Sequence, residues 1–441
     1  MRTKTHLEVF ISHEREGEYF TLPFEMPPHT ASVTLTYDYE RSPAQAIPLE
    51  HGTFTPRVAA NIIDLGLVAP DGTQVGASGS NKNRVTLSAT SATAGYTPRP
   101  LTPGRWQILV GAYKVAQEGV TITYDLEFTA EALCLYKGDL HTHTLASDGV
   151  LTAEELATHA RRHGLDFLAI TDHNQAAIGA ALPHIEGMTL IPGVEWTHYR
   201  GHANFLGIDR PYDEPFFTNS EEETRARFVS ARERGALIVI AHPFDEHCGF
   251  AFDLDDLPFD CLEVWNGPMR ESNLRAVNFW LEMLAAGKKV PMTGGSDYHR
   301  DTLFQIVGGP CMGVYAMSAS PRALLSAVRE GHSFVTFSPQ GPSLEMTCDG
   351  AILGDSVPWR PGMTVHLHVD GLKAGDVVKL VSAQGSQDVY HAPADGILDV
   401  ERPIEAPGFA LVQVWRTFLP GVPPLLALLS NPIYFEGPSA E

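Results

Sequence analysis

Two histidines with the spacing of a metal-binding pair introduce the part of the sequence that is richest in reactive side chains. His141 and His143 lie two residues apart in the run GDLHTHT, and on a strand two such side chains project to the same side. Imidazoles that share a side can bind one metal ion together. The spacing alone is a weak signal, because His366 and His368 repeat it without the series of acidic and histidine motifs that follows the first pair, and there we expect an ordinary strand face.

Further histidines and carboxylates follow this pair along the chain. They stand at the ends of short apolar runs that we interpret as strands. The residues concerned are Asp148, Asp172, His173, Glu195, His242, Asp297 and His299. If the strand ends meet at one rim, these groups are crowded, and repulsion and lost hydration make the arrangement costly without cations. The sequence therefore predicts a metal centre with several ligands.

Strands and helices that could position these residues alternate from about Tyr136 onward. The predicted strands are 166–171, 188–192, 203–208, 236–241, 261–265 and 290–293, and the predicted helices are 153–163, 221–234 and 275–286. Such alternation indicates βα units with parallel strands. In a βα barrel the active site lies at the carboxyl ends of the strands, where the polar residues of this chain stand.

The segments on either side have a different rhythm, in which short β-type runs alternate with Gly, Pro, Asn and Asp turns. We expect a β-sandwich or jelly-roll accessory domain over residues 1–135, a catalytic α/β domain over 136–340 and a second all-β sandwich over 341–441. Two or three domains also agree with a chain of 441 residues.

The charge balance narrows the class of substrate. There are 31 Lys and Arg residues against 53 Asp and Glu, and the resulting net charge of -22 repels polyanions. Long nucleic acid is therefore a disfavoured partner, and a small substrate is favoured. The sequence gives no indication of the oligomeric state.

The N-terminal residues and the cysteines indicate a cellular compartment. The first residues lack the apolar core of a signal peptide, and we see no apolar stretch long enough to span a membrane. The five cysteines are widely spaced without a CxxC pair, which argues against a disulfide framework and a thiolate zinc site. We expect a soluble cytoplasmic protein with reduced thiols and no membrane partner.

The order of the motifs resembles the PHP superfamily, named for polymerase and histidinol phosphatase, over about residues 136–340. The motifs are His141-x-His143, Asp148, Thr171-Asp172-His173, Gly193-x-Glu195, Ala241-His242-Pro243 and Ser296-Asp297-x-His299. The resemblance implies a distorted seven-stranded βα barrel with up to three metal ions at one end.

The resemblance also implies which residues bind each ion. The first ion would be held by His141, His143, Glu195 and Asp297. The second would be held by Glu195, His242 and His202, with His198 as the alternative to His202. The third would be held by Asp148, His173 and His299, and at the position of Asp148 many relatives carry histidine. Oxygen and nitrogen ligands suit two or three divalent or trivalent ions of manganese, zinc or iron.

Further polar residues near the motifs have supporting roles in this interpretation. Asp172 is expected to orient a ligand imidazole. Glu263 and Asn266 could line the pocket or belong to a structural turn. Arg270 is the preferred cation for binding substrate, ahead of Arg200 and Arg300, and we expect it to act with the ligands Glu195 and Asp297 in catalysis.

Metal ions acting as Lewis acids lower the pKa of bound water and supply a bridging hydroxide as the nucleophile. The leading hypothesis is a phosphoesterase for small phosphate mono- or diesters. The flanking β-domains and the run 427–434 are more similar to a carbaryl-hydrolase-like branch, which implies carbamate or carboxylic ester cleavage. Two more hypotheses are a catalytically inactive binding protein and a nuclease for nucleotides or short ends.

Overall fold

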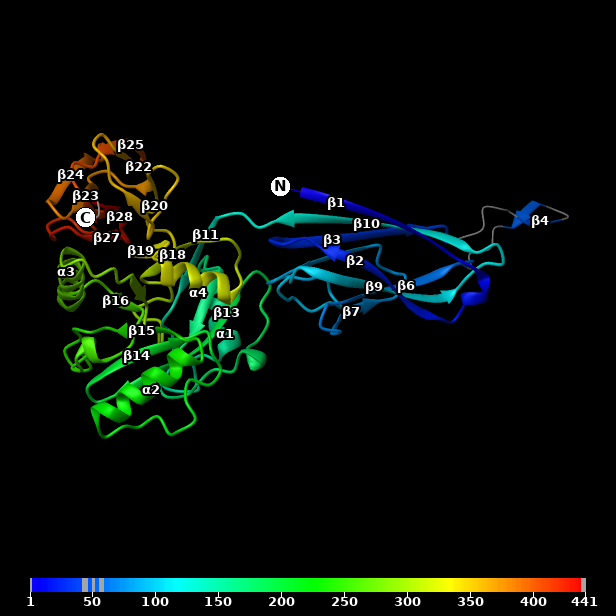
Figure 1. Cartoon of the computed structure of the whole chain (residues 1–441), viewed down its shortest axis with the longest axis horizontal. Helices are drawn as coiled ribbons and strands as arrows, with labels where there is room; N and C mark the ends of the chain where they lie inside the picture. The colour runs from blue at the N-terminus through cyan, green and yellow to red at the C-terminus, as the bar shows by residue number, and fades with distance from the viewer. Residues whose placement is uncertain (1, 42–46, 50–51, 55–58, 438–441) are drawn as a thin grey trace. The chain divides into compact units, whose positions relative to one another are not determined.

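The computed structural model describes residues 2–41, 47–49, 52–54 and 59–437. Two compact units make up the chain, Met1–Ala132 and Leu133–Glu441, coloured from blue to cyan and from green to red in Figure 1. Among the described residues, no helix has the length and apolar character needed to cross a membrane.

The first unit consists of β-strands, as its alternating sequence predicts. Along β10 (Val120–Ala130), Ile122, Tyr124 and Leu126 are buried while the residues between them are more exposed, so one face of the strand packs into a core. Two antiparallel four-stranded sheets, in the orders β1-β10-β3-β8 and β2-β9-β6-β7, share that core. The other strands are β1 (Arg2–Ile11), β2 (Tyr19–Met26), β3 (Thr30–Tyr39), β4 (Ile47–Leu49), β5 (Gly52–Phe54), β6 (Ile62–Val68), β7 (Gln74–Ser78), β8 (Arg84–Ser88) and β9 (Gly104–Lys114), and the short helix η1 is His13–Arg15.

The second unit begins with seven strands that are hydrogen-bonded to one another in sequence order. They are β11 (Cys134–Asp139), β12 (Phe167–Ile170), β13 (Thr189–His198), β14 (Gly201–Leu206), β15 (Leu237–Ala241), β16 (Cys261–Asn266) and β17 (Met292–Gly295). Six of these overlap the strands predicted from the sequence, and β11 begins close to Tyr136, where the change of rhythm was seen. All four residues of β12 and all five of β15 are buried, which explains their continuous apolar runs.

Helices are fewer than a regular βα barrel requires. The described residues contain four α-helices, namely α1 (Ala153–Arg162), α2 (Glu221–Glu233), α3 (Glu271–Ala285) and α4 (Pro321–Glu330), and the short helices η2 (Gly179–Ala181) and η3 (Leu254–Asp256). Helix α1 starts with a capping box, in which Thr152 and Glu155 bond each other's backbone N–H groups. No α-helix connects β15 to β16 among the described residues, and that connection and α3 line a cavity of about 800 Å³.

The expectation of uniformly parallel strands is wrong at β14 because only Tyr199 and Arg200 separate it from β13. A two-residue turn cannot carry the chain back for a parallel crossover, so β14 runs antiparallel to both β13 and β15. The remaining neighbours among the seven strands are parallel. The architecture is therefore a mixed α/β sheet.

The segments that follow β11 and β17 meet at one end of the sheet. The Asp297 N–H donates to the His141 carbonyl at 2.9 Å, and the His143 N–H donates to the Tyr298 carbonyl at 2.9 Å. These bonds bring the first and the last of the seven strands together just beyond their carboxyl ends, where the predicted ligands stand.

The same sheet continues into the C-terminal part of the chain. Strand β18 (Cys311–Ala316) pairs with β11, β19 (Ser333–Thr336) pairs with β18, and β27 (Leu425–Ser430) pairs with β19. The remaining strands are β20 (Ser343–Thr347), β21 (Ser356–Pro358), β22 (Thr364–Leu372), β23 (Val377–Ser382), β24 (Gly385–His391), β25 (Gly396–Pro403), β26 (Gly408–Arg416) and β28 (Ile433–Glu436). Residues 341–441 thus belong to the same compact unit as the seven strands.

Candidate metal centre

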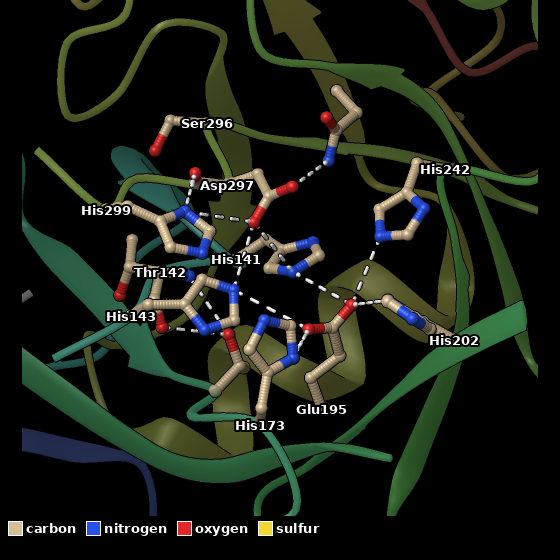
Figure 2. Close-up of polar contacts among 12 residues, drawn as sticks. His141, Thr142, His143, His173, Glu195, His202, His242, Ser296, Asp297 and His299 are labelled. Carbon is tan, nitrogen blue, oxygen red and sulfur yellow. Dashed lines mark hydrogen bonds and ion pairs between the residues drawn. The ribbon is translucent and has the colours of Figure 1, made fainter. Parts of the chain in front are cut away.

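Six histidines and two carboxylates converge at this end of the sheet, around the side chain of Glu195 in β13 (Figure 2). Glu195 is completely buried. Its Oε1 lies 2.9 Å from His202 Nδ1, 3.1 Å from His242 Nε2 and 3.4 Å from His141 Nε2. Its Oε2 lies 2.7 Å from His173 Nδ1 and 3.6 Å from His143 Nε2. Five imidazoles therefore surround one carboxylate.

Asp297 forms a second meeting point beyond the end of β17. Its Oδ1 lies 3.0 Å from His143 Nε2, 3.5 Å from His141 Nε2 and 3.7 Å from His299 Nδ1. The backbone φ of Asp297 is +52°, a left-handed conformation that a residue with a side chain adopts at a cost. The protein maintains that conformation at the point where Asp297 meets His141 and His143.

A third group lies nearer the solvent. Ligand atoms of His143, Asp148, His173 and His299 all lie within 4.8 Å of one another. Asp148 Oδ1 is 3.1 Å from His299 Nε2 and 3.7 Å from His173 Nε2. The Asp148 side chain is 59% exposed, whereas that of His143 is completely buried. This group therefore forms the accessible end of the centre.

Three buried atoms at the centre make no hydrogen bond within the described part of the chain, and they test whether cations fit here. They are Nε2 of His141, Nε2 of His143 and Oε2 of Glu195. Oε2 lies close to His173 Nδ1, but that nitrogen bonds Thr197 Oγ1 at 2.7 Å. Leaving a buried polar atom unpaired costs about 1–3 kcal/mol, and metal ions would satisfy all three. A set of nitrogen and oxygen donors fits manganese, zinc or iron.

The pKa shifts within the cluster show how strongly its members interact. Burial disfavours a charged imidazole at His141, but the carboxylates of Glu263, Asp297 and Glu195 outweigh it and raise the His141 pKa well above its usual value. Burial also opposes ionisation of Glu195, yet His141 and the other imidazoles hold its pKa well below the usual range. The imidazoles therefore favour the ionised form of Glu195 although it is fully buried, and a buried charge is stabilised by cationic partners.

Glu263 and Asn266 form hydrogen bonds that hold His141, the His242 backbone and Asp297 in place. The carboxylate of Glu263 in β16 lies 3.1 Å from His141 Nδ1 and accepts a 2.9 Å bond from the backbone N–H of His242. Asn266 donates to Glu263 at 3.1 Å and to Asp297 Oδ2 at 3.4 Å. Both residues therefore support the cluster, and neither forms a simple turn.

The structure distinguishes the two histidines proposed for the same position. His202 lies on β14 with Nδ1 facing Glu195. His198 stacks on Trp196 with an interplanar angle of 2° and bonds the Thr218 carbonyl through Nε2. His202 is therefore part of the cluster and His198 is directed elsewhere.

Asp172 differs from its expected role as a partner of an imidazole. It accepts bonds from the backbone N–H and the hydroxyl of Thr144, each at 2.7 Å, and from the Ser147 hydroxyl at 2.7 Å. Ser147 in turn lies 3.5 Å from His143 Nδ1. Asp172 thus fixes the loop after His143 and reaches the imidazole only through Ser147.

The three candidate arginines have different surroundings. Arg270 lies 3.7 Å from Asp245 and 3.4 Å from Asn266 Oδ1, beside the cluster, with its side chain 51% exposed. Arg200 is held by Glu221 at 3.0 Å and by the Ala251 carbonyl at 2.9 Å. Arg300 is exposed, and no hydrogen bond or ion pair is found for it in the described residues. The role of Arg270 in binding substrate stays a prediction.

Two supporting residues carry no clear signal in the sequence. Asp139 is completely buried and accepts bonds from the backbone N–H groups of His141, Ser296 and Gly308, and burial raises its pKa to about 6. Cys248 has its sulfur 3.6 Å from His242 Nδ1. A lone cysteine six residues after a histidine has no recognisable motif, and only the folded loop brings the two together.

Comparison with known proteins gives several sequence matches. No protein-family model matches the chain. It is 42% identical to the 5'-3' exoribonuclease Rnm of Salmonella typhimurium over 107 residues, which are 22% of this chain and 36% of that protein. It is 32% identical to a 3',5'-nucleoside bisphosphate phosphatase of Chromobacterium violaceum over 112 residues, 23% of this chain and 38% of that protein. The chain therefore spans well under half the length of these two relatives.

Two further matches cover a larger part of the other protein. An uncharacterised protein of Methanocaldococcus jannaschii is 30% identical over 152 residues, which are 31% of this chain and 84% of that protein. A solved structure from Bacteroides vulgatus, a two-domain protein containing a predicted PHP-like metal-dependent phosphoesterase, aligns with a TM-score of 0.40 at 18% identity over 68% of this chain and 95% of that one. From the sequence matches and from the ordered motifs that the fold gathers around Glu195, we conclude that the chain belongs to the PHP superfamily of metal-dependent hydrolases.

Proposed function

We propose that this protein is a phosphoesterase that cleaves small phosphate mono- or diesters with two or three bound ions of manganese, zinc or iron. The observation that carries the proposal is the buried Glu195, which has five imidazoles around it and an oxygen without a hydrogen-bond partner in the described residues. Bound ions would act as Lewis acids and lower the pKa of water toward neutrality. The architecture we propose around this site is a distorted barrel formed by β11–β17, with a sandwich domain over 1–135 and a second sandwich over 341–441 that shares part of its core with the barrel.

The protein's own residues would hold the ions and fix the geometry. Glu195 can offer one oxygen to each of two ions, because its two oxygens face different sets of imidazoles. Asp297, His141 and His143 would complete the first site. Glu263 accepts from His141 Nδ1, and this contact leaves Nε2 of that ring facing the acids.

Substrate would approach from the exposed end of the cluster. The Asp148 side chain is 59% exposed and those of His173 and His299 are 27% and 24% exposed, whereas Glu195 is fully buried. Arg270, half exposed beside Asn266, is the cation we propose for binding a phosphate oxygen and orienting the ester.

Small substrates are favoured because the net charge of -22 opposes the approach of a long polyanion. The match to the bisphosphate phosphatase supports the same choice. Removal of nucleotides from short RNA ends is a second candidate, which the 42% identity to an exoribonuclease favours. Experiment must separate these from carbamate or carboxylic ester cleavage, as in the carbaryl-hydrolase-like branch, and from binding without catalysis.

A panel of substrates tests the proposal. The purified full-length chain is stripped with a chelator, reloaded separately with Mn²⁺, Zn²⁺ and Fe²⁺, and assayed with an aryl phosphate, a bis-aryl phosphate, an aryl ester and a short 5'-phosphorylated RNA. We expect faster turnover of a phosphate ester than of the aryl ester, and no turnover after stripping. Faster turnover of the aryl ester would refute the phosphoesterase assignment, and less than one equivalent of bound metal after reloading would favour a binding protein.

Replacing the central carboxylate tests which residues hold the ions. We expect Glu195→Gln to lower kcat/KM by about 100-fold or more and to reduce the bound metal, because an amide lacks the negative charge with which Glu195 would hold the ions. His198→Ala is the matched control, since this histidine is close in sequence but stacks on Trp196, away from the cluster. Equal loss in both variants would mean that Glu195 acts only through folding.

A further inference from the structure

Four of the six imidazoles in the cluster have a partner on Nδ1 that can fix the orientation of the ring. These four place Nε2 toward Glu195, Asp297 or Asp148. The Nδ1 partners are Glu263 for His141, Ser147 for His143, the Asp297 carbonyl for His299 and Cys248 for His242. A partner on Nδ1 fixes the ring orientation and leaves Nε2 as the free donor toward a metal ion. Three of these partners are oxygens, and the fourth is a sulfur.

The sulfur of Cys248 lies in a loop that is closely held. Asp245 Oδ1 accepts from the backbone N–H groups of His247 and Cys248 at 2.9 and 3.3 Å. It also accepts from the Cys248 thiol at 3.3 Å. Because the thiol hydrogen is directed to Asp245, the lone pairs of the sulfur are available to the His242 Nδ1–H, 3.6 Å away.

The position of the sulfur argues for an indirect role. The two nitrogens of an imidazole point in diverging directions, and His242 directs Nε2 at Glu195 Oε1, 3.1 Å away. Cys248 and Glu195 therefore contact His242 through different nitrogens of its ring, on different sides. The unpartnered atoms of the centre, Nε2 of His141 and of His143 and Oε2 of Glu195, also belong to the side that Nε2 of His242 faces.

We propose that Cys248 is a positioning residue of the metal centre, whose sulfur accepts from Nδ1 of His242 and so holds Nε2 toward Glu195. The inference rests on the metal centre of the proposed function. The remaining cysteines do not share this role. Cys261, Cys311 and Cys348 are buried away from the cluster, and Cys134 is exposed at the start of β11.

Binding of Co²⁺ to the full-length protein, followed by visible absorption in competition with a chelator, tests this role without relying on activity. We expect Cys248→Ala and Cys248→Val to weaken Co²⁺ binding by about 10- to 100-fold, as for other outer partners of metal-bound histidines. We expect Cys248→Ser to restore binding to within about threefold, because a hydroxyl can also accept from Nδ1–H. Cys134→Ser is the matched control and should bind Co²⁺ as the wild type does.

A double-mutant cycle separates positioning from a general effect on folding. In a His242→Ala background, Cys248→Ala should cause no further loss of Co²⁺ affinity, since the group through which it acts is gone. Additive losses in the cycle would overturn the proposal. So would wild-type affinity in Cys248→Ala and Cys248→Val, or Cys248→Ser binding as weakly as the apolar variants.

Spectroscopy gives an independent outcome. If the sulfur were itself a ligand, the Co²⁺ protein would show a sulfur-to-metal charge-transfer band that Cys248→Ser abolishes, and this would overturn the positioning role. A wild-type protein that binds no Co²⁺ would overturn the proposed metal centre and this inference together. Wild-type binding that is unaffected by the Cys248 variants would overturn the inference alone.

Discussion

At the scale of single residues, the centre depends on how closely the backbone of Gly295 approaches His141. A Cβ atom on Gly295 would collide with the Cβ of His141 and would lie 2.8 Å from Glu263 Oε1. These two side chains are bonded to each other through His141 Nδ1, so the added methyl group would displace both together. Only glycine therefore allows β17 to end beside His141 without displacing the side chain of that histidine.

We expect Gly295→Ala to weaken metal binding by about 10-fold or more while the protein remains folded, because the clash falls on His141, a proposed ligand, and on Glu263, its proposed outer partner. Calorimetric titration with Mn²⁺ and circular dichroism would measure the two effects. Gly396→Ala is the matched control, since a Cβ there meets nothing within 4 Å. Unchanged Mn²⁺ affinity in Gly295→Ala would show that the loop after β17 can move to accommodate the methyl group.

The sequence was sufficient to identify the residues of the cluster but not those that support them. His141, Glu195 and Asp297 could be found because they follow apolar strands in a recognisable order. The choice between His198 and His202 stayed open because β13 was expected to end at residue 192 and in fact extends to His198. With that extension, the period of two along a strand directs His198 to the opposite side from Glu195.

At the scale of elements, β22 carries the second pair of histidines with the HxH spacing. His366 Nε2 and His368 Nδ1 each lie 3.0 Å from an oxygen of Asp399 on the neighbouring strand β25. The sequence suggested an ordinary strand face because the pair lacks the series of strand-end motifs that follows His141 and His143, and its acidic partner comes from the neighbouring strand β25. The two histidine side chains are 41% and 39% exposed and that of Asp399 is 63% exposed, unlike the buried pair after β11.

The two histidines lower the pKa of the Asp399 carboxyl by hydrogen bonds, first from His368 and then from His366. A lowered pKa means that the ionised carboxylate favours the folded state, so this contribution is present above the unfolded pKa and is lost as the pH falls through the lowered value. We expect the double substitution His366→Val and His368→Val to raise the Asp399 pKa toward 3.8, as measured by carboxyl NMR titration. Asp395, which is held by Lys373, should keep its lowered pKa and serves as the internal control. An unchanged Asp399 pKa would contradict the role of the two histidines.

Elements marked by an apolar run or by helical periodicity could be predicted from the sequence, whereas the direction of a strand within the sheet could not. The buried strands other than β13 lie close to their predicted bounds, as do α1 and α2, whereas α3 begins at Glu271 instead of the predicted Arg275. Helix α4 was missed, although Ser320 caps it and Pro321 begins it. The antiparallel direction of β14 could not be read from composition, because an apolar run looks the same in either direction and only the two-residue turn decides it.

At the scale of the whole molecule, the boundaries of the hydrophobic cores do not all match the positions at which the sequence pattern changes. The core of the first unit consists entirely of residues up to Phe128. The core around the seven strands instead includes Phe409, Leu411, Leu426 and Leu429 from the C-terminal segment. The sequence shows that the β-rich rhythm returns after residue 340, but it cannot show that β27 pairs with β19 and shares a core with the α/β part.

Two deletions test whether residues 341–441 are needed for the fold of the seven strands or form an independent domain. We expect residues 133–441 to fold alone and to bind metal with the stoichiometry of the full chain, because every residue of the cluster and the cores around it lie within that unit. We expect residues 1–340 to lose the metal centre and to expose apolar surface. That deletion removes the pairing partner of β19, and it removes Asn431, whose side chain bonds the backbone of Met292 at the start of β17. The unfolding temperature and the amount of bound metal, measured for each deletion protein, would test both expectations. A stable, metal-binding 1–340 fragment would mean that 341–441 is an independent domain after all, and the support of β17 would then have to come from within the seven strands.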